Sequence, residues 1–377
     1  MQMKKRLTLI LLTLSLAGLL SLTGCGKGDQ EATSDNTFST EDEVTADEAE
    51  DTEDTKEDKE EAEEEEVAPE GMYRSELTNE WISEDLKDQR PIAVMVDNEK
   101  TALPHYGLSQ ADIIYEMMNS TLNDHITRFM VLVKDYDSIK QLGSVRSVRP
   151  TNLMIAPEWN AIVCHDGGPF YINTFLNNPY VDHFSGTFSR VKNGKPREFT
   201  EYILTGDMAK NFKNNSSIDR SYNEYAPKEA HFQFASESKP IELDGTDCTL
   251  VDLPFKHNGS QLDYDAESGT YLYSEYGSKH LDPGNGNKQL AFKNVILQKM
   301  SYSQLDEHGY MVWNCLASGQ EGYYITNGKA IPITWTKTSD TERTVYRDLN
   351  GDEITINTGK TYIGFVADDV WSELVVE

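Results

Sequence analysis

The chain has 377 residues, 38% of them hydrophobic, and a formal net charge of −30 at pH 7. This acidic composition argues against nucleic acid as a partner, because binding it requires a basic face. The charge is unevenly distributed: residues 28–70 contain 21 Asp and Glu against two Lys, which leaves a net charge of −15 on residues 71–377.

Residues 1–24 have the pattern of a lipoprotein signal peptide. A basic start at residues 4–6 precedes an apolar run from Leu7 to Leu20, and residues 22–25 read Leu-Thr-Gly-Cys, a lipobox. The run is shorter than the about 20 residues of a membrane-spanning helix, and an ordinary signal peptide has no need of this cysteine. The sequence therefore predicts lipidation (palmitate) of Cys25 and anchoring to the extracytoplasmic face of the cell membrane.

Residues 25–70 are predicted to be a disordered acidic linker that begins at the lipidated cysteine. The stretch 28–70 contains one aromatic residue, Phe38, and almost no aliphatic ones. It cannot bury enough apolar surface to offset its ordering entropy, so a solvated tether is the expectation. Docking of cations or of a basic partner is the alternative for such a charge run.

Residues 71–238 are predicted to form a mixed α/β domain. Four apolar runs are typical of strands buried on both faces, namely 91–98, 112–118, 126–135 and 160–167. Three stretches are predicted as helices, namely 149–159, 169–178 and 199–212. Thr200 is predicted to cap the last of these helices.

Residues 239–377 are predicted to form a β-rich domain, so that the whole is an α+β protein with a boundary near 230–245. The stretch 260–277 is expected to be a hairpin, and Asn327-Gly328 and Asn350-Gly351 are strong hairpin turns because both residue types tolerate positive φ. Trp313 and Trp335 are expected in the core rather than as a platform for a sugar.

An ordered series of stretches resembles the YerB-like bacterial lipoprotein family. The first part of the series contains "GSVRSVRP" (143–150) and "HDGG" (165–168), and the second contains "NGKAIPITWTK" (327–337). The resemblance covers nearly all of residues 85–368. It implies an envelope-anchored, two-domain protein of a family without an established activity, and it implies no catalytic residues.

Asp97, Glu116 and Arg128 form a first group of candidate site residues, each within or at the end of a predicted buried strand. An unpaired buried charge is costly, so a Glu116–Arg128 ion pair is the simpler interpretation. The alternative is that Asp97 and Glu116 are convergent carboxylates that act as general acid and base on a glycan.

Arg146 and Arg149 are the candidate ligand-binding pair, with Arg128 in support. They precede a predicted helix, and each guanidinium can bind a carboxylate or phosphate through two parallel hydrogen bonds. The alternative is that both arginines brace acidic loops. An anionic ligand would be a peptide-stem carboxylate or a phosphate-bearing polymer.

The segment 164–168, Cys-His-Asp-Gly-Gly, follows a predicted strand at the sheet edge where open α/β folds place their sites. His165 is a candidate for acid/base catalysis or ligand contact, and Asp166, Gly167 and Gly168 for ligand contact. A histidine that only ties the turn is the competing interpretation. Cys164 would point to the opposite face from His165, which argues against a cysteine nucleophile.

No cofactor and no metal site are predicted. Asp348–Glu353 lacks EF-hand spacing and is expected to be a hairpin tip. His280 and Asp282 are assigned to a surface loop that would more often not bind a metal. Disulfide pairing among Cys164, Cys248 and Cys315 stays open.

The sequence therefore predicts a membrane-anchored lipoprotein that binds an anionic cell-wall ligand or another envelope protein, and that is more readily a binder than an enzyme. A wall glycan or peptide hydrolase or transferase, using Asp97 and Glu116 or His165, is the first alternative. A structural adaptor of wall-synthesis machinery is the second.

Overall fold

The computed structural model describes residues 67–377, which belong to one compact unit. The predicted signal peptide, Cys25 and all but the last residues of the predicted linker lie outside the described residues. No helix in the described part of the chain has the length and apolar character needed to cross a bilayer. The longest α-helix there, α3 (Asp207–Asn214), has 8 residues.

A mixed sheet of 11 strands forms the centre of the unit. Its path runs β12-β24-β23-β20-β27-β4-β5-β3-β7-β8, with β25 added beside β24. In this order the strands are Thr246–Asp247, Lys329–Lys337, Ala317–Thr326, Asn294–Met300, Thr361–Ala367, Ile113–Met118, Thr127–Val133, Ile92–Asp97, Ile162–His165, His183–Ser185 and Val345–Arg347.

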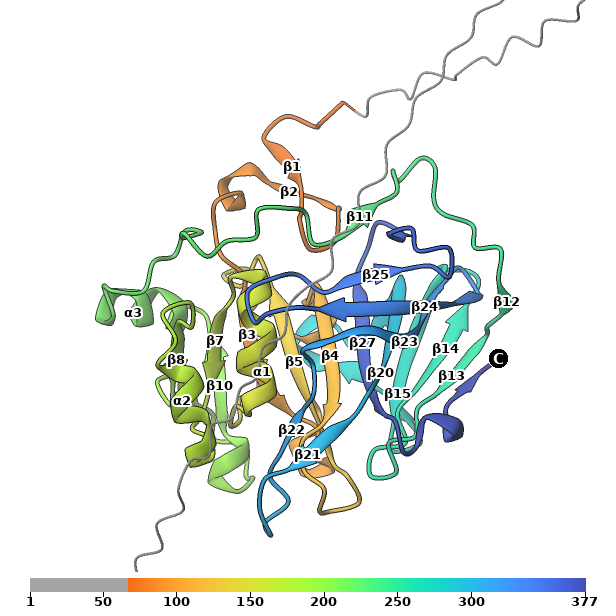
Figure 1. The fold of residues 1–377 in the computed structure, drawn as a ribbon. Helices are drawn as coiled ribbons and strands as arrows, with labels where there is room; N and C mark the ends of the chain where they lie inside the picture. Colours follow the sequence, from red (N-terminus) through yellow and green to blue (C-terminus); the bar gives the residue numbers. More distant parts are fainter. Residues whose placement is uncertain (1–66) are drawn as a thin grey trace, which may run out of the picture. The chain divides into compact units, whose positions relative to one another are not determined.

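Strands from both halves of the chain pair within this sheet. Strand β27, from the second half of the chain, lies parallel to β4, with Gly364 opposite Glu116, and also parallel to β20. The predicted mixed α/β character of the first half and β-rich character of the second half are confirmed. Figure 1 shows that both halves contribute strands to the central sheet. The boundary at residue 238 stays a prediction; the polar segment 235–245 carries no helix or strand.

The remaining strands form smaller sheets around the centre. The largest of these has six strands, β16-β15-β14-β13-β28 with β19 beside β15. Its strands, in the same order, are Ser278–Lys279, Thr270–Glu275, Gln261–Asp265, Leu250–Asp252, Val375–Val376 and Ala291–Phe292. A three-stranded sheet has the order β6 (Gln141–Gly143), β10 (Glu201–Leu204) and β9 (Ser189–Arg190). The remaining strands form two-stranded sheets: β1 (Met72–Arg74) with β2 (Trp81–Ser83), β11 (Gln233–Phe234) with β26 (Thr355–Ile356), β17 (Leu281–Asp282) with β18 (Lys288–Gln289), and β21 (Tyr302–Gln304) with β22 (Met311–Trp313).

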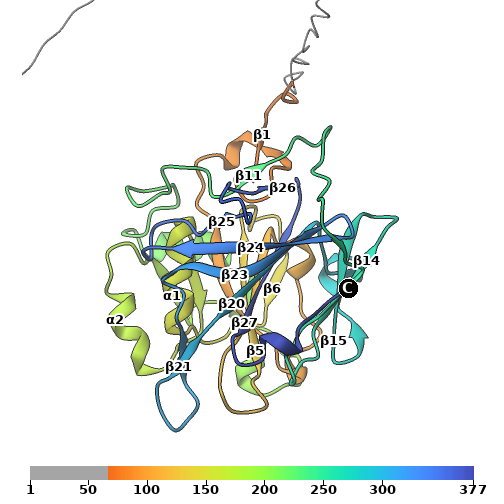
Figure 2. The same cartoon turned by 45° about the vertical axis from the view of Figure 1, so that its right-hand side comes forward.

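The two faces of the central sheet bury two separate cores, because successive strand residues point to opposite sides. Val94 and Ile114 face one core together with Tyr273 of β15. Met95 and Met117 face the other, together with residues of α1 (Pro150–Ile155). In Figure 2 the β14–β15 hairpin lies on the right-hand side and α1 on the left.

The four strands predicted from apolar runs in the first half are confirmed as β3, β4, β5 and β7. Helices α1 with η4 (Ala156–Trp159), and η5 (Phe170–Ile172) with α2 (Asn173–Leu176), confirm two of the three predicted helical stretches. The short 3-10 helices that complete the described elements are η1 Glu84–Leu86, η2 Lys100–Ala102, η3 Leu108–Gln110, η6 Arg197–Phe199, η7 Pro283–Asn285 and η8 Trp371–Glu373.

The prediction of one helix over 199–212 was wrong in its first half. Residues 201–204 form strand β10, which pairs with β6 and β9, and α3 begins only at Asp207. Thr200 is not the N-cap of this helix, since the N-cap of α3 is Gly206 at φ 89°; Thr200 is instead the C-cap residue of the short 3-10 helix η6. Pairing with strands distant in sequence outweighed the local helical pattern.

The predicted 260–277 hairpin, the Asn327-Gly328 turn and the burial of both tryptophans in the second half are confirmed. The hairpins β14–β15 and β23–β24 turn at Ser268-Gly269 and Asn327-Gly328. Trp313 and Trp335 are buried, and Cys164, Cys248 and Cys315 are buried free thiols. Assigning His280 and Asp282 to a surface loop was wrong, since both are buried.

Candidate functional site

Asp97, Arg128 and Arg146 are in direct contact at the carboxyl end of β3. Asp97 Oδ2 accepts hydrogen bonds from Arg128 Nη2 at 3.1 Å and from Arg146 Nε at 2.6 Å. Its Oδ1 accepts one from the Glu99 N–H at 2.8 Å. Burial raises the pKa of Asp97, but the two guanidinium groups outweigh it, so the pKa lies below its usual value and the carboxylate is ionised.

Arg149 lies beside this ion-pair cluster. Its guanidinium lies 5.1 Å from the ring centre of Tyr310, and Nη1 donates to the Val148 carbonyl at 3.1 Å. Burial, and then the charge of Arg128, lowers the pKa of Arg149 to about 9. We call the group the arginine corner; it consists of Asp97, Arg128, Arg146 and Arg149.

The arginine corner has more donors than acceptors. Arg128 Nε and Arg149 Nε are both buried with no hydrogen-bond partner among residues 67–377. A cavity of about 10 Å³, the size of one water molecule, lies between these two arginines and Asn119. On the open side the Arg146 side chain is 19% exposed and reaches Glu198 at 3.4 Å. The excess positive charge suits a carboxylate or phosphate ligand.

Glu116 does not belong to this corner. In the sheet register Asp97 lies opposite Arg128, and Arg128 lies opposite Met117. These three side chains therefore share one face of the sheet, and Glu116, the neighbour of Met117, points to the other. The predicted Glu116–Arg128 ion pair was wrong, and Asp97 and Glu116 do not converge as a two-carboxylate acid/base pair requires.

The Glu116 carboxylate is buried among neutral donors. It accepts hydrogen bonds at 2.7–3.1 Å from the side chains of Asn98, Thr127, Ser260, Tyr273 and Tyr362. Burial raises its pKa to about 7 despite these donors. The role of this group in the structure is to tie β4 and β5 to β15 and β27.

We expect Glu116→Gln to flatten the pH dependence of stability between about pH 4.5 and 7. The pKa of Glu116 is higher in the folded state than in the unfolded chain, so as the pH rises the unfolded chain loses the carboxyl proton first. The stabilising contribution of Glu116 is therefore fully present below pH 4.5 and is lost as the pH rises through 7. The loss in the unmodified chain is roughly 3 kcal/mol at most. Urea unfolding at pH 5 and pH 8 measures it. The exposed substitution Glu321→Gln is the control, and an unchanged slope in Glu116→Gln would contradict the prediction.

His165 ties the turn that follows β7. Its Nδ1 lies 2.8 Å from the Gly167 carbonyl and its Nε2 lies 3.1 Å from His183 Nδ1. Since a carbonyl only accepts, the proton of His165 is on Nδ1, and Nε2 accepts from His183. Burial lowers the pKa of His165 to about 4, with a further contribution from His183 and an opposing one from the Gly167 carbonyl. The imidazole is therefore neutral.

Asp166 belongs to a second charged group beside the arginine corner. Its Oδ2 accepts from Arg190 Nη2 at 2.8 Å, and the same nitrogen also binds Glu201. Burial and the nearby Asp166 carboxylate raise the pKa of Glu201 to about 7, whereas the pKa of Asp166 is lowered by Arg190 against the effect of burial.

Backbone hydrogen bonds join the two predicted motifs. The Asp166 N–H donates to the Arg146 carbonyl at 2.9 Å, and the Val148 N–H to the Gly167 carbonyl at 3.0 Å. A Cβ on Gly168 would lie 2.9 Å from the Val148 carbonyl, so the close approach requires glycine. Arg146, Asp166 and the glycines, which come from separate candidate motifs, are therefore neighbours, while the His165 ring points towards His183.

Sequence reasoning missed Arg190 and its surroundings. Residues 190–197 contain four basic residues, Arg190, Lys192, Lys195 and Arg197, in an otherwise acidic chain. Arg190 pairs with Asp166, and Lys192 and Arg197 are exposed. This local basic run was the signal that could have extended the predicted site. The structure contradicts a joint acid/base role for Asp97 and Glu116, whereas the catalytic role considered for His165 stays a prediction.

Comparison with known proteins places the chain among relatives of similar fold. A family described as "Protein of unknown function (DUF3048)" matches with its N-terminal domain at residues 77–219 and its C-terminal domain at residues 251–363. "Putative lipoprotein YerB" of Bacillus subtilis (strain 168) is 24% identical over 312 residues, covering 80% of this chain and 86% of that protein. The crystal structure of YerB protein from Bacillus subtilis, 20% identical, has a TM-score of 0.68 and covers 81% of this chain and 99% of that chain, which shows a shared fold.

Proposed function

Because the chain belongs to the DUF3048 family of proteins of unknown function, we propose a function from its own residues: it is a lipoprotein, anchored through Cys25 to the extracytoplasmic face of the cell membrane, that binds an anionic cell-envelope ligand at the arginine corner. The lipobox at residues 22–25 supports the anchor. Similarity to a protein named as a lipoprotein supports the same assignment.

The observation that carries the ligand proposal is the charge of the corner. Arg128, Arg146 and Arg149 gather around one buried carboxylate in a folded region with a net charge of −15. Like charges are brought together at an energetic cost, which an anion bound between them offsets. The exposed edge of Arg146 and the basic run 190–197 give such an anion a route from solvent.

The ligand class follows from the donors. Guanidinium groups bind carboxylate and phosphate oxygens through paired hydrogen bonds, so a phosphate-bearing wall polymer or the carboxylates of a wall peptide fit the corner. Three guanidinium groups lie close together, which favours a ligand whose charged groups can contact more than one of them.

Titration of the full chain, purified in detergent, with glycerol-phosphate oligomers and with stem peptides tests the proposal. We expect binding that weakens with salt, and a loss of about tenfold or more in affinity in Arg146→Ala, since each charged hydrogen bond contributes about 1.5–3 kcal/mol. Arg146→Lys keeps the charge and should retain part of the affinity.

The matched control is Arg347→Ala, which removes the same charge from an exposed position at the end of β25. Equal affinity in Arg146→Ala and the unmodified chain, or no binding of any of these anions by a folded sample, would refute the ligand proposal. Binding abolished only in the corner variants supports it.

A further inference from the structure

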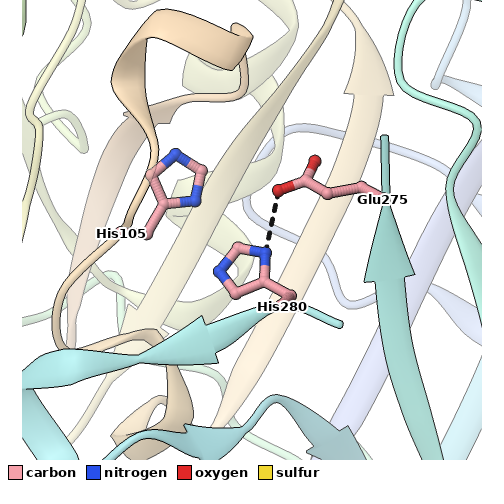
Figure 3. Close-up of side chains that lie close together, drawn as sticks. All are labelled: His105, Glu275 and His280. Atoms are coloured by element: carbon pink, nitrogen blue, oxygen red, sulfur yellow. Dashed lines mark hydrogen bonds and ion pairs between the residues drawn. The ribbon is translucent and has the colours of Figure 1, made fainter. Parts of the chain in front are cut away.

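Three metal-binding side chains converge in the interior, away from the arginine corner. His105 lies in the loop between η2 and η3, Glu275 ends β15, and His280 precedes β17. One ligand atom from each lies within 4.8 Å of the others. Figure 3 shows the two imidazole rings and the carboxylate turned towards one another, with Glu275 bonded to His280.

These groups are buried yet poorly satisfied. Their exposed fractions are 0% for His105, 2% for Glu275 and 3% for His280. Both ring nitrogens of His105, Nε2 of His280 and Oε2 of Glu275 have no hydrogen-bond partner among residues 67–377. Buried polar atoms are normally paired, so several unpaired atoms in one cluster indicate a missing partner.

The charge of this interior region points to a cation. Glu116 and Glu275 are both buried, and within the described part of the chain neither forms an ion pair with a lysine or an arginine. Among residues 67–377, the ion pair recorded for Glu275 is with His280, at 2.9 Å. A divalent cation would compensate these two carboxylates, neither of which pairs with a lysine or an arginine among residues 67–377.

The loop that carries His105 is held firmly against the strand that follows His280. Asp282 accepts hydrogen bonds from the Gly107 and Ser109 N–H groups, each at 3.1 Å, and from the Ser109 hydroxyl at 2.8 Å. Phe129 packs its ring edge-on against both histidines. The three side chains are therefore positioned by the fold, which is what a metal site requires.

We propose that His105, Glu275 and His280 bind one divalent transition-metal ion of the zinc class. Two imidazoles and one carboxylate are a ligand set that zinc and its neighbours favour over calcium or magnesium. The 2.9 Å between His280 Nδ1 and Glu275 Oε1 is close to the roughly 3 Å that separates neighbouring ligands of one such ion. The ion would displace the proton that these two atoms share.

The ion is structural, because all three ligands are closed off from solvent. It joins the segment matched by the N-terminal family domain, which contains His105, to the segment matched by the C-terminal domain, which contains Glu275 and His280. Binding would therefore stabilise the pairing of the two halves, in the manner of any ligand that binds only the folded state.

His231 provides the matched control for this proposal. It is also buried, and neither ring nitrogen has a hydrogen-bond partner in the described structure. Its Nε2 lies 3.6 Å from one carboxylate oxygen, Oε1 of Glu158. No second histidine or further carboxylate completes a metal cluster around it among residues 67–377. A variant at His231 therefore perturbs a buried imidazole without touching the proposed ligands.

Metal analysis of the full chain, purified in detergent after expression with added zinc or cobalt, tests the proposal. We expect about one zinc ion per chain, a lower melting temperature after chelation, and at least tenfold less metal in His105→Gln and Glu275→Gln. His231→Gln should keep its metal. Equal metal content in His105→Gln and the unmodified chain would overturn the proposal, as would a folded unmodified chain that takes up no zinc.

Spectroscopy of the unmodified chain keeps the test decisive if the buried variants fail to fold. Cobalt bound by two imidazoles and a carboxylate should give visible absorption, and X-ray absorption of the zinc form should show two histidine ligands. Sulfur ligands would overturn the assignment, because they would place the ion at the free thiols Cys164, Cys248 or Cys315. A spectrum without histidine ligands would overturn it as well.

Discussion

Replacing Lys337 with Met is expected to lower the free energy of unfolding by about 3–5 kcal/mol at neutral pH, because it leaves a buried carboxylate unpaired. Lys337 Nζ lies 2.9 Å from Glu158 Oε2, and both side chains are 1% exposed. The same oxygen accepts from the Thr344 N–H and hydroxyl, and Oε1 accepts from the Tyr115 hydroxyl at 3.0 Å.

The expected loss depends on pH in a way that identifies its cause. Burial raises the pKa of Glu158, but Lys337 and the other partners outweigh it, so the folded-state pKa lies below the usual 4.5. The contribution of Glu158 is therefore present above pH 4.5 and is lost as the pH falls through the folded-state value. Without Lys337 the buried carboxyl can take up a proton, so the destabilisation should shrink as the pH is lowered.

Chemical unfolding of the two forms between pH 4 and pH 8 measures this difference. Lys329→Met is the control, since Lys329 lies on the same strand but pairs with the exposed Asp247, and its loss should leave stability almost unchanged. Equal stability of Lys337→Met and Lys329→Met at neutral pH would show that the buried pair does not contribute as described.

Asp97→Asn is expected to destabilise the protein by about 3 kcal/mol, and phosphate should restore much of that loss. The substitution removes the carboxylate that binds Arg128 and Arg146, and leaves three neighbouring guanidinium groups without it. An added anion can then take the place of the carboxylate. Melting temperatures with and without phosphate, at constant ionic strength, separate this effect from general screening.

Asp182→Asn is the matched control for the phosphate effect. Asp182 pairs with the buried Arg90, a single arginine outside the corner. We expect this variant to be destabilised too, but to gain no more from phosphate than the unmodified chain does. If phosphate rescues both variants equally, the anion acts on the protein in general and not on the arginine corner.

Much of the candidate site was predictable from residue type and spacing. Arg146, Arg149 and Asp166 were identified because basic residues, glycines and a strand end occur together in an acidic chain, and the structure places the two motifs side by side. The Arg190 contribution was missed because its partner Asp166 is 24 residues away, and nothing local indicates that pairing. The partners of Glu116 were missed for the same reason: Tyr273 and Tyr362 lie on strands 157 and 246 residues further along the chain.

Strands β3, β4, β5 and β7, the hairpin turns, the buried tryptophans and the family could be predicted from the sequence, because apolar runs, turn residues and ordered motifs are local properties of the chain. Which charges meet could not be predicted, because it depends on the pairing of strands that are distant in the chain. Successive residues of a strand point to opposite faces, so Glu116 of β4 faces tyrosines on one side of the sheet while Asp97 of β3 faces arginines on the other. The same holds for His105, Glu275 and His280: the sequence drew attention to His280 alone, and the three become a candidate metal site only because the fold brings distant segments together.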